Sequence, residues 1–490
     1  MSTKEWAGLA VLALPTALLG LDVTVLYLTM PSLAADLDPT GTEVLWIMDA
    51  YGFLIAGFLI TMGTLGDRIG RRRLLMIGSA CFGAVSVVAA FAPNAEVLIG
   101  ARAALGIAAA TLMPSTLALI STMVPDPARR AVAIGGWVTA FALGMAAGPV
   151  VGGLLVEHFW WGAAFLVAIP IVVVVLLAGP KVLPEHQAPR SGRIDMVSVV
   201  LSLLALLPVI YAVKHVAEAG VGLSTVVPLV AGVGFGVLFV RRQRGQDDPL
   251  LDIRLFSGRT FSAALGVMVV GLTGVGGVML LVTQYLQQIA ALPPLRAGAW
   301  MGPPALAMFA AAIATPLIAR RIRPAYVAGA VLAVSTVGYA LLVTVDGTDD
   351  VVPVVAGFAL VYLSLGTIAA LGTDLVVGAV PPARAGAASA LSETVQELGL
   401  ALGVAVLGSI AAATYRAQVP ADAAGPVRDS LAGALSNAGS VPETVIQQAK
   451  DAAISGLNVA ALVAGIGVLV LAVLAAVVLR HVGTYKSQVG

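Results

Sequence analysis

Cysteine, histidine and charged residues are all scarce in this sequence. The single cysteine, Cys81, cannot form an internal disulfide. The 4 histidines are not grouped with cysteine or aspartate, and no serine–histidine arrangement stands out, so we expect no metal, no cofactor and no enzymatic activity. Charged residues make up 11% of the chain, against roughly 25% in an average soluble protein. A soluble domain could not cover its surface with so few charges.

The charge balance and the placement of glycine exclude two further classes. The formal net charge is +1, so no nucleic-acid partner is implied. Glycine-rich strings lie inside apolar blocks, not between a strand and a helix, so they do not read as a nucleotide-binding loop. Any energy-driven process would therefore draw on the proton gradient and not on ATP.

The sequence consists mainly of long apolar blocks. Hydrophobic residues make up 59% of the chain, and a helix that spans a bilayer needs about 20 mostly apolar residues. Backbone groups inside the bilayer must find partners within the segment, which favours helices. The sequence predicts an all-α integral membrane protein with fourteen spans, near 6–30, 43–64, 74–92, 97–119, 131–157, 162–179, 196–213, 224–240, 261–285, 297–319, 325–344, 351–379, 385–412 and 456–479.

Lysine and arginine are distributed unevenly between the loops. An even number of spans places both termini on one side, and that side holds 21 of the 27 basic residues. Because cytoplasmic loops carry the excess of Lys and Arg, we expect both termini in the cytoplasm of a plasma-membrane protein. The first apolar block has no convincing cleavage site, so we interpret it as an uncleaved span and not as a signal peptide.

An internal sequence repeat predicts two related halves of the chain. Residues 124–131, Val-Pro-Asp-Pro-Ala-Arg-Arg-Ala, precede the fifth span, and residues 380–387, Val-Pro-Pro-Ala-Arg-Ala-Gly-Ala, precede the thirteenth. Similar loops that lead into similar helices are typical of transporters built from parallel repeats. The alignment pairs Gly144 with Gly399, Gly148 with Gly403 and Gly153 with Gly408.

This repeat predicts the domain organisation. We expect a six-helix bundle over 1–179, a central two-helix insert with cytoplasmic connectors over 180–260, and a second six-helix bundle over 261–490. The second bundle includes an outside loop near 413–455, with a helical stretch from Val441 to Ile454. This loop is either a surface hairpin or a lid over the outer mouth.

A glycine- and arginine-rich motif, Gly-Thr-Leu-Gly-Asp-Arg-Ile-Gly-Arg-Arg-Arg, connects the second and third spans at residues 63–73. Glycine permits a tight turn and close helix approach. The aspartate can accept hydrogen bonds from a helix N-terminus or pair with an arginine, so the motif can form a contact that is made in one conformation and broken in another. Its candidate residues are Gly63, Asp67, Arg68, Gly70 and Arg71.

A second motif, Gly-Met-Ala-Ala-Gly-Pro-Val-Val-Gly-Gly, lies inside the fifth span at residues 144–153. Small residues four positions apart let helices pack closely in lipid, and proline permits a bend. The simpler interpretation is a generic packing face. The candidate residues are Gly144, Gly148, Pro149, Gly152 and Gly153.

Three of the candidate residues in the first half are charged and lie inside predicted spans, where a charge is costly and needs a partner. Arg102 lies in the fourth span, Asp22 in the first and Asp49 in the second. The two aspartates lie at similar depth by residue count, so they can share one cavity, and buried carboxylates can carry protons. For Arg102 the alternative is a purely structural ion pair.

These motifs resemble those of the major facilitator superfamily. Residues 63–73 resemble its signature loop, residues 144–153 its exporters' antiporter motif, and Arg102 its span-four arginine, which is implicated in proton transfer. Nearly the whole chain is similar to the fourteen-helix drug:proton antiporters, especially pumps for quaternary ammonium compounds. The resemblance implies the major facilitator fold, with two six-helix bundles and two central extra helices.

The resemblance also extends to the acidic residues of the second half. It includes residues 389–399, where Glu393 and Glu397 lie four apart on one helix face. We expect these two, with Asp22 and Arg102, to take part in proton coupling. Some relatives carry an acid in the tenth span, whereas residues 303–316 have none here, which puts the handling of divalent cations in doubt.

Candidate substrate-binding residues are aromatic, sulfur-containing or acidic. Aromatic rings can stack on a cationic ligand, although packing and interface anchoring are alternatives for each. Asp374 is either a lining residue or a structural cap. The candidates are Trp46, Asp49, Tyr51, Trp137, Met308, Phe309, Tyr362 and Asp374.

The sequence thus predicts a monomeric, proton-coupled multidrug exporter of lipophilic, often cationic, compounds that works by alternating access within a lipid bilayer. One alternative is a dedicated exporter of an endogenous antibiotic, lipid or siderophore. Another is a nonconductive sensor of the same fold.

Overall fold

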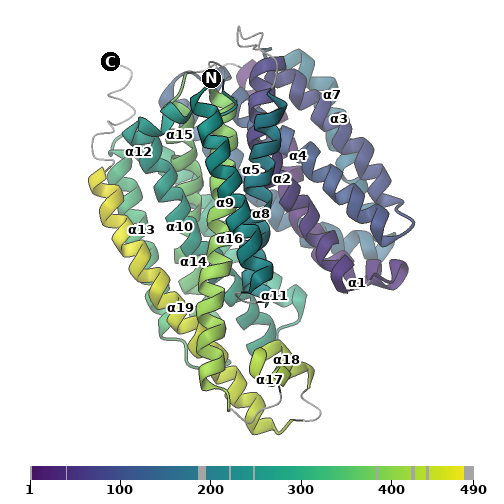
Figure 1. The fold of residues 1–490 in the computed structure, drawn as a ribbon, viewed down its shortest axis with the longest axis vertical. Coiled ribbons are helices and arrows are strands. Elements are labelled where there is room, and N and C mark those ends of the chain that lie inside the picture. The colour runs from purple at the N-terminus through teal and green to yellow at the C-terminus, as the bar shows by residue number, and fades with distance from the viewer. Residues whose placement is uncertain are drawn as a thin grey trace.

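Long helices make up nearly all of the described chain. The computed structural model describes residues 3–39, 41–185, 195–219, 222–246, 249–381, 384–420, 425–437 and 441–478. Fourteen of its helical segments are long and apolar enough to cross a membrane, which confirms the predicted number. Figure 1 shows them standing side by side along one common direction.

The first part of the chain forms an N-terminal bundle. Its helices are α1 (Thr3–Leu37), α2 (Gly41–Ile69), α3 (Arg71–Ala90), α4 (Ala95–Met123), α5 (Pro127–His158), α6 (Ala163–Leu166) and α7 (Ala168–Val182). Helix α5 packs along α1, and α4 packs against both α2 and α3. Between α2 and α3 the chain turns at Gly70, whose φ of 104° lies in the region that favours glycine.

The last part of the chain forms a C-terminal bundle. Its elements are α10 (Arg259–Gln284), η2 (Tyr285–Ile289), α11 (Pro294–Trp300), α12 (Gly302–Ala319), α13 (Pro324–Val343), α14 (Val351–Thr367), η3 (Ile368–Gly372), α15 (Thr373–Gly378), α16 (Ala385–Gln418), α17 (Gly425–Asp429), α18 (Leu431–Ser436) and α19 (Glu443–Val478). Helix α16 packs along α10, and α19 along α13. The π-helical segments η2 and η3 interrupt two spans.

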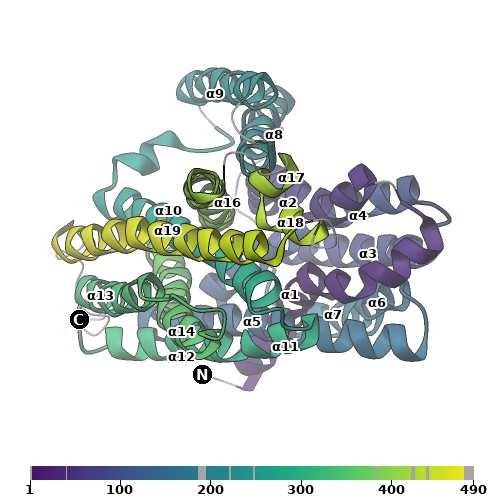
Figure 2. The same ribbon diagram turned by 90° about the horizontal axis from the view of Figure 1, so that it is seen from below.

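Two helices between the bundles, α8 (Met196–Ala219) and α9 (Leu223–Arg244), form a separate hairpin. Helix α8 packs against α2 of one bundle and α16 of the other, while α9 packs on α8 (Figure 2). A short 3₁₀ helix, η1 (Ile253–Ser257), then leads into α10. The hairpin therefore stands at the junction of the two bundles, outside both.

The segment predicted as an outside loop near 413–455 is largely helical. Helix α16 continues to Gln418, and α19 begins at Glu443, so the stretch from Val441 to Ile454 contains the first turns of the last span. Between them, α17 is fixed by the Tyr415 hydroxyl, which donates to the carbonyl O of Val427 at 2.8 Å. The loop is therefore shorter than predicted.

Glycine brings α5 into close contact with α1. A Cβ added at Gly144 would lie 1.9 Å from the carbonyl O of Ala17, and one at Gly148 would lie 2.0 Å from Thr24 Oγ1. A Cβ at Gly152 would lie 2.7 Å from the carbonyl O of Val25. No larger residue fits these positions without moving the helices apart. The motif therefore sets how closely α1 and α5 pack.

The C-terminal bundle repeats this interface between α16 and α10. A Cβ at Gly403 would lie 2.1 Å from the carbonyl O of Thr273, and one at Gly399 would lie 2.9 Å from Leu272 Cβ. On α10, Gly277 faces the carbonyl O of Gly403. The glycines that the sequence alignment pairs at 144 and 399, and at 148 and 403, thus occupy equivalent interfaces.

Candidate functional site

Arg102 of α4 lies at the centre of a buried polar cluster in the N-terminal bundle. Its Nη1 is 2.6 Å from Oδ2 of Asp22 on α1, and its Nε donates to the carbonyl O of Ile47 on α2 at 3.1 Å. Its guanidinium lies over the ring of Tyr51, 4.5 Å from the ring centroid. We call Asp22, Tyr51 and Arg102 the Asp22 cluster; each is at most 4% exposed.

This cluster supplies the partner that an arginine inside a membrane span requires. Arg102 and Asp22, which the sequence analysis expected to act together, form an ion pair across 80 residues of chain. The Tyr51 ring, a candidate for stacking on a ligand, instead has one face against the protein's own guanidinium. Because three helices meet here, a change of charge at Asp22 acts on α1, α2 and α4 together.

The Tyr51 hydroxyl is the least satisfied polar group of this cluster. Among the described residues it has no hydrogen-bond partner, although it is buried. It lies within electrostatic range of Asp22, Arg102 and also Glu397 on α16. Charges from both bundles therefore act on this one buried hydroxyl.

Glu393 and Glu397 differ in their surroundings although they lie one turn apart. Glu393 is 4% exposed and accepts a hydrogen bond from Gln396 Nε2 at 3.3 Å. Glu397 is exposed, and its charge interacts with that of Glu393. With a rise of 1.5 Å per residue, Glu397 lies about 18 Å from the start of α16, near the middle of a bilayer core of about 30 Å.

The remaining candidates of the N-terminal bundle are placed as follows. Asp49 belongs to α2, but its side chain lies outside the described part of the structure. Trp46 is 40% exposed and meets Phe53 edge-on, with ring centroids 6.2 Å apart. Trp137 is buried in the bundle core, and its Nε1 donates to Thr116 Oγ1 at 2.9 Å. Trp137 is thus engaged in packing within its own bundle.

The candidates of the C-terminal bundle lie on α12 and α14. Met308 is buried, Phe309 is half-buried, and Tyr362 packs against Phe358 with ring centroids 4.4 Å apart. The backbone at Met308 also meets α14 closely, because a Cβ at Gly366 would lie 2.2 Å from its carbonyl O. Met308 and Tyr362 belong to the core of this bundle.

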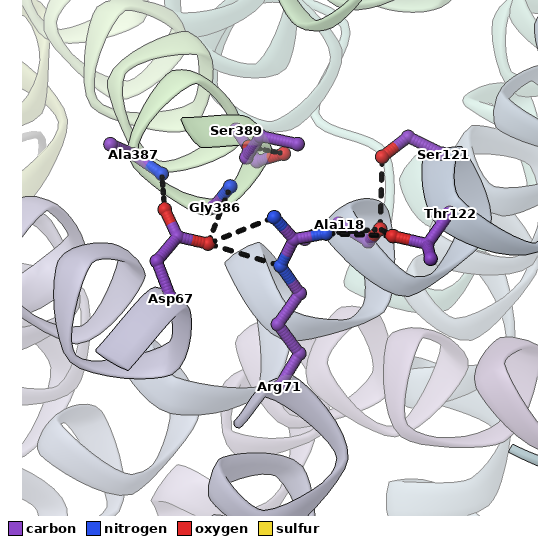
Figure 3. A network of polar contacts seen from close by, with 9 residues as sticks. Asp67, Arg71, Ala118, Ser121, Thr122, Gly386, Ala387 and Ser389 are labelled. Atoms are coloured by element: carbon purple, nitrogen blue, oxygen red, sulfur yellow. Dashed lines mark hydrogen bonds and ion pairs between the residues drawn. The ribbon is translucent and has the colours of Figure 1, made fainter. Parts of the chain in front are cut away.

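The motif between α2 and α3 forms a cluster with the start of α16 (Figure 3). Asp67 Oδ1 accepts from Arg71 Nε at 3.0 Å and from the backbone N–H of Gly386 at 3.2 Å, and Asp67 Oδ2 accepts from the N–H of Ala387 at 3.1 Å. We call these four residues the Asp67 cluster, and the end of the molecule where they lie the Asp67 end. Both roles considered for this aspartate are realised at once, and the helix it meets belongs to the other bundle.

A further hydrogen bond and close helix packing fix the Asp67 cluster in place. Arg71 is 1% exposed and its Nη1 also donates to Thr122 Oγ1 at 2.7 Å. A Cβ at Gly63 would lie 2.6 Å from the carbonyl O of Gly386, so α2 and α16 are in direct contact. Arg68, also of this motif, is half-buried on the last turn of α2.

An ion pair also joins the bundles at the same end. Arg130 Nε, on the first turn of α5, is 2.8 Å from Oδ1 of Asp374 on α15, and the Asp374 side chain is 1% exposed. Asp374, considered as a lining or structural residue, is therefore engaged in a contact between bundles. Arg130 is not among the candidate residues predicted from the sequence, although the repeated segment before the fifth span contains it.

The segment before α10 is tied to both bundles. Thr64 on α2 donates to the carbonyl O of Leu250 at 2.9 Å, and Arg384, just before α16, forms an ion pair with Asp252. These contacts place the connector beside the Asp67 cluster, within the same turn of α2.

Comparisons with known proteins agree with this architecture. The chain is 40% identical to the multidrug efflux pump LfrA of Mycolicibacterium smegmatis, over 98% of this chain and 97% of that protein. It is 32% identical to the methyl viologen resistance protein SmvA of Salmonella typhimurium, over 92% of each chain. The fold resembles the crystal structure of the human organic anion transporter MFSD10, with a TM-score of 0.63 at 16% identity, over 96% of this chain and 100% of that chain.

A family profile matches most of the chain as well. Residues 12–404 match the Major Facilitator Superfamily, and this range contains the Asp22 cluster, both glycine motifs and the Asp67 cluster. The superfamily consists of membrane transporters, not enzymes, which agrees with the fourteen apolar helices of a multi-pass membrane protein. The chain belongs to the Major Facilitator Superfamily.

Proposed function

We propose that this protein exports lipophilic, often cationic, compounds in exchange for protons, by alternating access. The observation that carries the proposal is the buried ion pair between Asp22 and Arg102, whose guanidinium also lies over the Tyr51 ring. The names of its relatives, a multidrug efflux pump and a methyl viologen resistance protein, support the class of substrate.

Charge balance makes the Asp22 cluster suitable for exchange. With Asp22 ionised, its charge compensates that of Arg102, and a substrate cation meets no net positive charge there. A proton on Asp22 leaves the Arg102 charge uncompensated in a medium of low dielectric constant, which repels a bound cation. Proton and cation therefore exclude one another, which is the requirement for antiport.

The acids of α16 extend this scheme to the second bundle. Glu397 is exposed and can bind a cationic group directly, while Glu393 is buried one turn away. Two carboxylates at this spacing do not ionise independently, so the pair can serve as a second proton station. We expect Asp49, with the rings of Trp46, Tyr51, Trp137, Phe309 and Tyr362 and the side chain of Met308, to contribute to substrate binding.

Alternating access requires that the contacts at the Asp67 end break and reform. The positive-inside distribution of Lys and Arg supports a cytoplasmic location for this end. The conformation described here, with the Asp67 cluster formed and Arg130 paired with Asp374, then corresponds to a state closed to the cytoplasm. Opening of that end would admit substrate from the inside.

The test is substrate export from cells that lack their own pumps, with ethidium as probe. Asp22→Asn should abolish efflux of all substrates, and Asp49→Asn should abolish efflux of monovalent cations such as ethidium. Glu393→Gln and Glu397→Gln should narrow the substrate range. Asp349→Asn, which changes an exposed aspartate in the turn before α14, is the matched control and should be silent.

Proton coupling needs a separate measurement. Addition of substrate to vesicles should release protons from the wild type and not from Asp22→Asn. Efflux that survives collapse of the proton gradient would refute antiport. A failure to transport any compound in the panel, with ligand binding intact, would favour the sensor of the same fold.

A further inference from the structure

A groove with a volume of about 590 Å³ lies between α9 and the segment that leads into α10. One wall is a single face of α9, where lining residues recur at helical spacing through Val233, Val237 and Val240. The other wall includes Leu251 and Phe256. Val233, Val237 and Phe256 are 56%, 48% and 41% exposed, so the groove is apolar and open to the surroundings of the protein.

The same face of α9 ends in two arginines. Arg241 and Arg244 follow Val237 at spacings of four and seven and also line the groove; both are exposed. The adjacent Arg242 has a different role, because it pairs with Asp195 at 2.7 Å. The groove is therefore apolar over most of its length and cationic at the Asp67 end.

The dimensions of the groove match one leaflet of a bilayer. From Val233 to Arg244 the helix rises about 16 Å, and half of a bilayer core is about 15 Å. Helix α9 is also the span with the smallest share of its most apolar window buried inside the protein, 17%. The groove thus faces lipid along its apolar part and the headgroup layer at its arginines.

We propose that this groove binds one anionic phospholipid, with its phosphate at Arg241 and Arg244 and an acyl chain along the valine face of α9. Basic clusters at the end of a span attract anionic headgroups, and the apolar walls remove the acyl chain from contact with water or other lipids. The match of charge and length selects a lipid over a soluble anion, which would leave the apolar part empty.

A lipid in the groove would also contact the segment that is bonded to both bundles at the Asp67 end. Its connector wall includes Leu251, which lies between Leu250, bonded to Thr64 of α2, and Asp252, paired with Arg384 before α16. A lipid that holds this segment in place therefore favours the arrangement in which α2 meets α16. Binding of the lipid should shift the protein towards closure of the Asp67 end.

The test uses the purified full-length protein and phosphatidylglycerol that carries a photoreactive diazirine in its acyl chain. Crosslinked peptides should fall within residues 233–256. Arg241→Gln/Arg244→Gln should weaken lipid binding about tenfold or more, as two lost phosphate contacts predict. The matched control, Arg129→Gln/Arg321→Gln, removes two exposed arginines outside the groove and should bind as the wild type does.

Two further arms decide the chemistry of the ligand. Phosphatidylcholine with the same acyl chains should bind at least about tenfold more weakly, and glycerophosphoglycerol, the headgroup without chains, should not compete. Crosslinks elsewhere, retained affinity in Arg241→Gln/Arg244→Gln, or equal loss in the control would overturn the site. Equal affinity for phosphatidylcholine would overturn the anionic assignment, and competition by the free headgroup would overturn the lipid. The peptide mapping needs no variant and remains decisive if the double variant fails to fold.

Discussion

Replacement of Asp67 by asparagine should shift the protein away from the closed Asp67 end without loss of substrate affinity. The carboxylate accepts two N–H groups from the first turn of α16, at 3.2 and 3.1 Å, and these bonds cross between the bundles. Its contact with Arg71 lies within one bundle and is four residues apart, so it can persist when the bundles separate. Only the two bonds to α16 therefore change between states.

The size of the effect follows from these two bonds. A hydrogen bond to a charged group contributes about 1.5–3 kcal/mol, and a negative charge at a helix N-terminus adds about 0.3–1 kcal/mol. Asparagine keeps one acceptor oxygen and loses the charge, so about half of this contribution remains. We expect the closed state to lose about 2 kcal/mol relative to the open state, which shifts the equilibrium about thirtyfold.

The assay is a distance distribution between spin labels at the Asp67 end. Cysteines at positions 73 and 321, both exposed arginines, would be labelled in a Cys81→Ser background. Asp67→Asn should populate the longer distance and reduce turnover. Ser389→Ala is the control, because the Ser389 hydroxyl donates at 2.7 Å to the carbonyl O of Ala385 in its own helix (Figure 3). An unchanged distribution in Asp67→Asn, or an equal change in Ser389→Ala, would refute the reasoning.

Three further predictions concern other contacts. Arg130→Gln should lower thermal stability by several degrees, because it removes the Arg130 cation from the buried Asp374, and the added Asp374→Asn change should restore most of the loss in a double-mutant cycle. Gly148→Val should abolish transport and lower the melting temperature, since its Cβ would lie 2.0 Å from a side-chain oxygen of α1. Hydrogen bonds from Arg242 lower the pKa of Asp195 below its ordinary value of about 3.9. A lowered pKa stabilises the folded state above that ordinary value, so the stability difference between wild type and Asp195→Asn should persist from pH 7 to about 4 and shrink below it.

The fold was predictable because its main determinant is local. Span number follows from the length of apolar blocks, and the repeat follows from glycines whose spacing is visible in the chain. The pairing of Arg102 with Asp22 was also accessible, since a charge inside a span demands a partner and few candidates existed. Each of these inferences needs only residue types and their order.

The contacts between bundles were not predictable in the same way. Asp67 meets the backbone of Gly386, 319 residues later, and Arg130 meets an acid 244 residues away. The sequence indicated that Asp67 needs a helix end or an arginine, but many helix ends and arginines satisfy that need. The helical first turns of α19 were separated from their span because their polar residues interrupt the apolar block, while the backbone continues through.

The two bundles share their glycine interfaces and differ in how they close against each other. At the start of α16, the backbone N–H groups meet a carboxylate of the opposite bundle, Asp67. At the start of α5, the helix end is capped within its own chain segment by Asp126, which accepts from the N–H of Arg129 at 2.8 Å. Arg130 is then the group that crosses to the other bundle, where it meets Asp374. Both links depend on an ionised carboxylate, but one is a helix-end contact and the other an ion pair. Closure of this end therefore depends on charge as well as on packing. Loss of charge at Asp67 removes the link made by the N-terminal bundle, and loss of charge at Asp374 removes the link made by the C-terminal bundle.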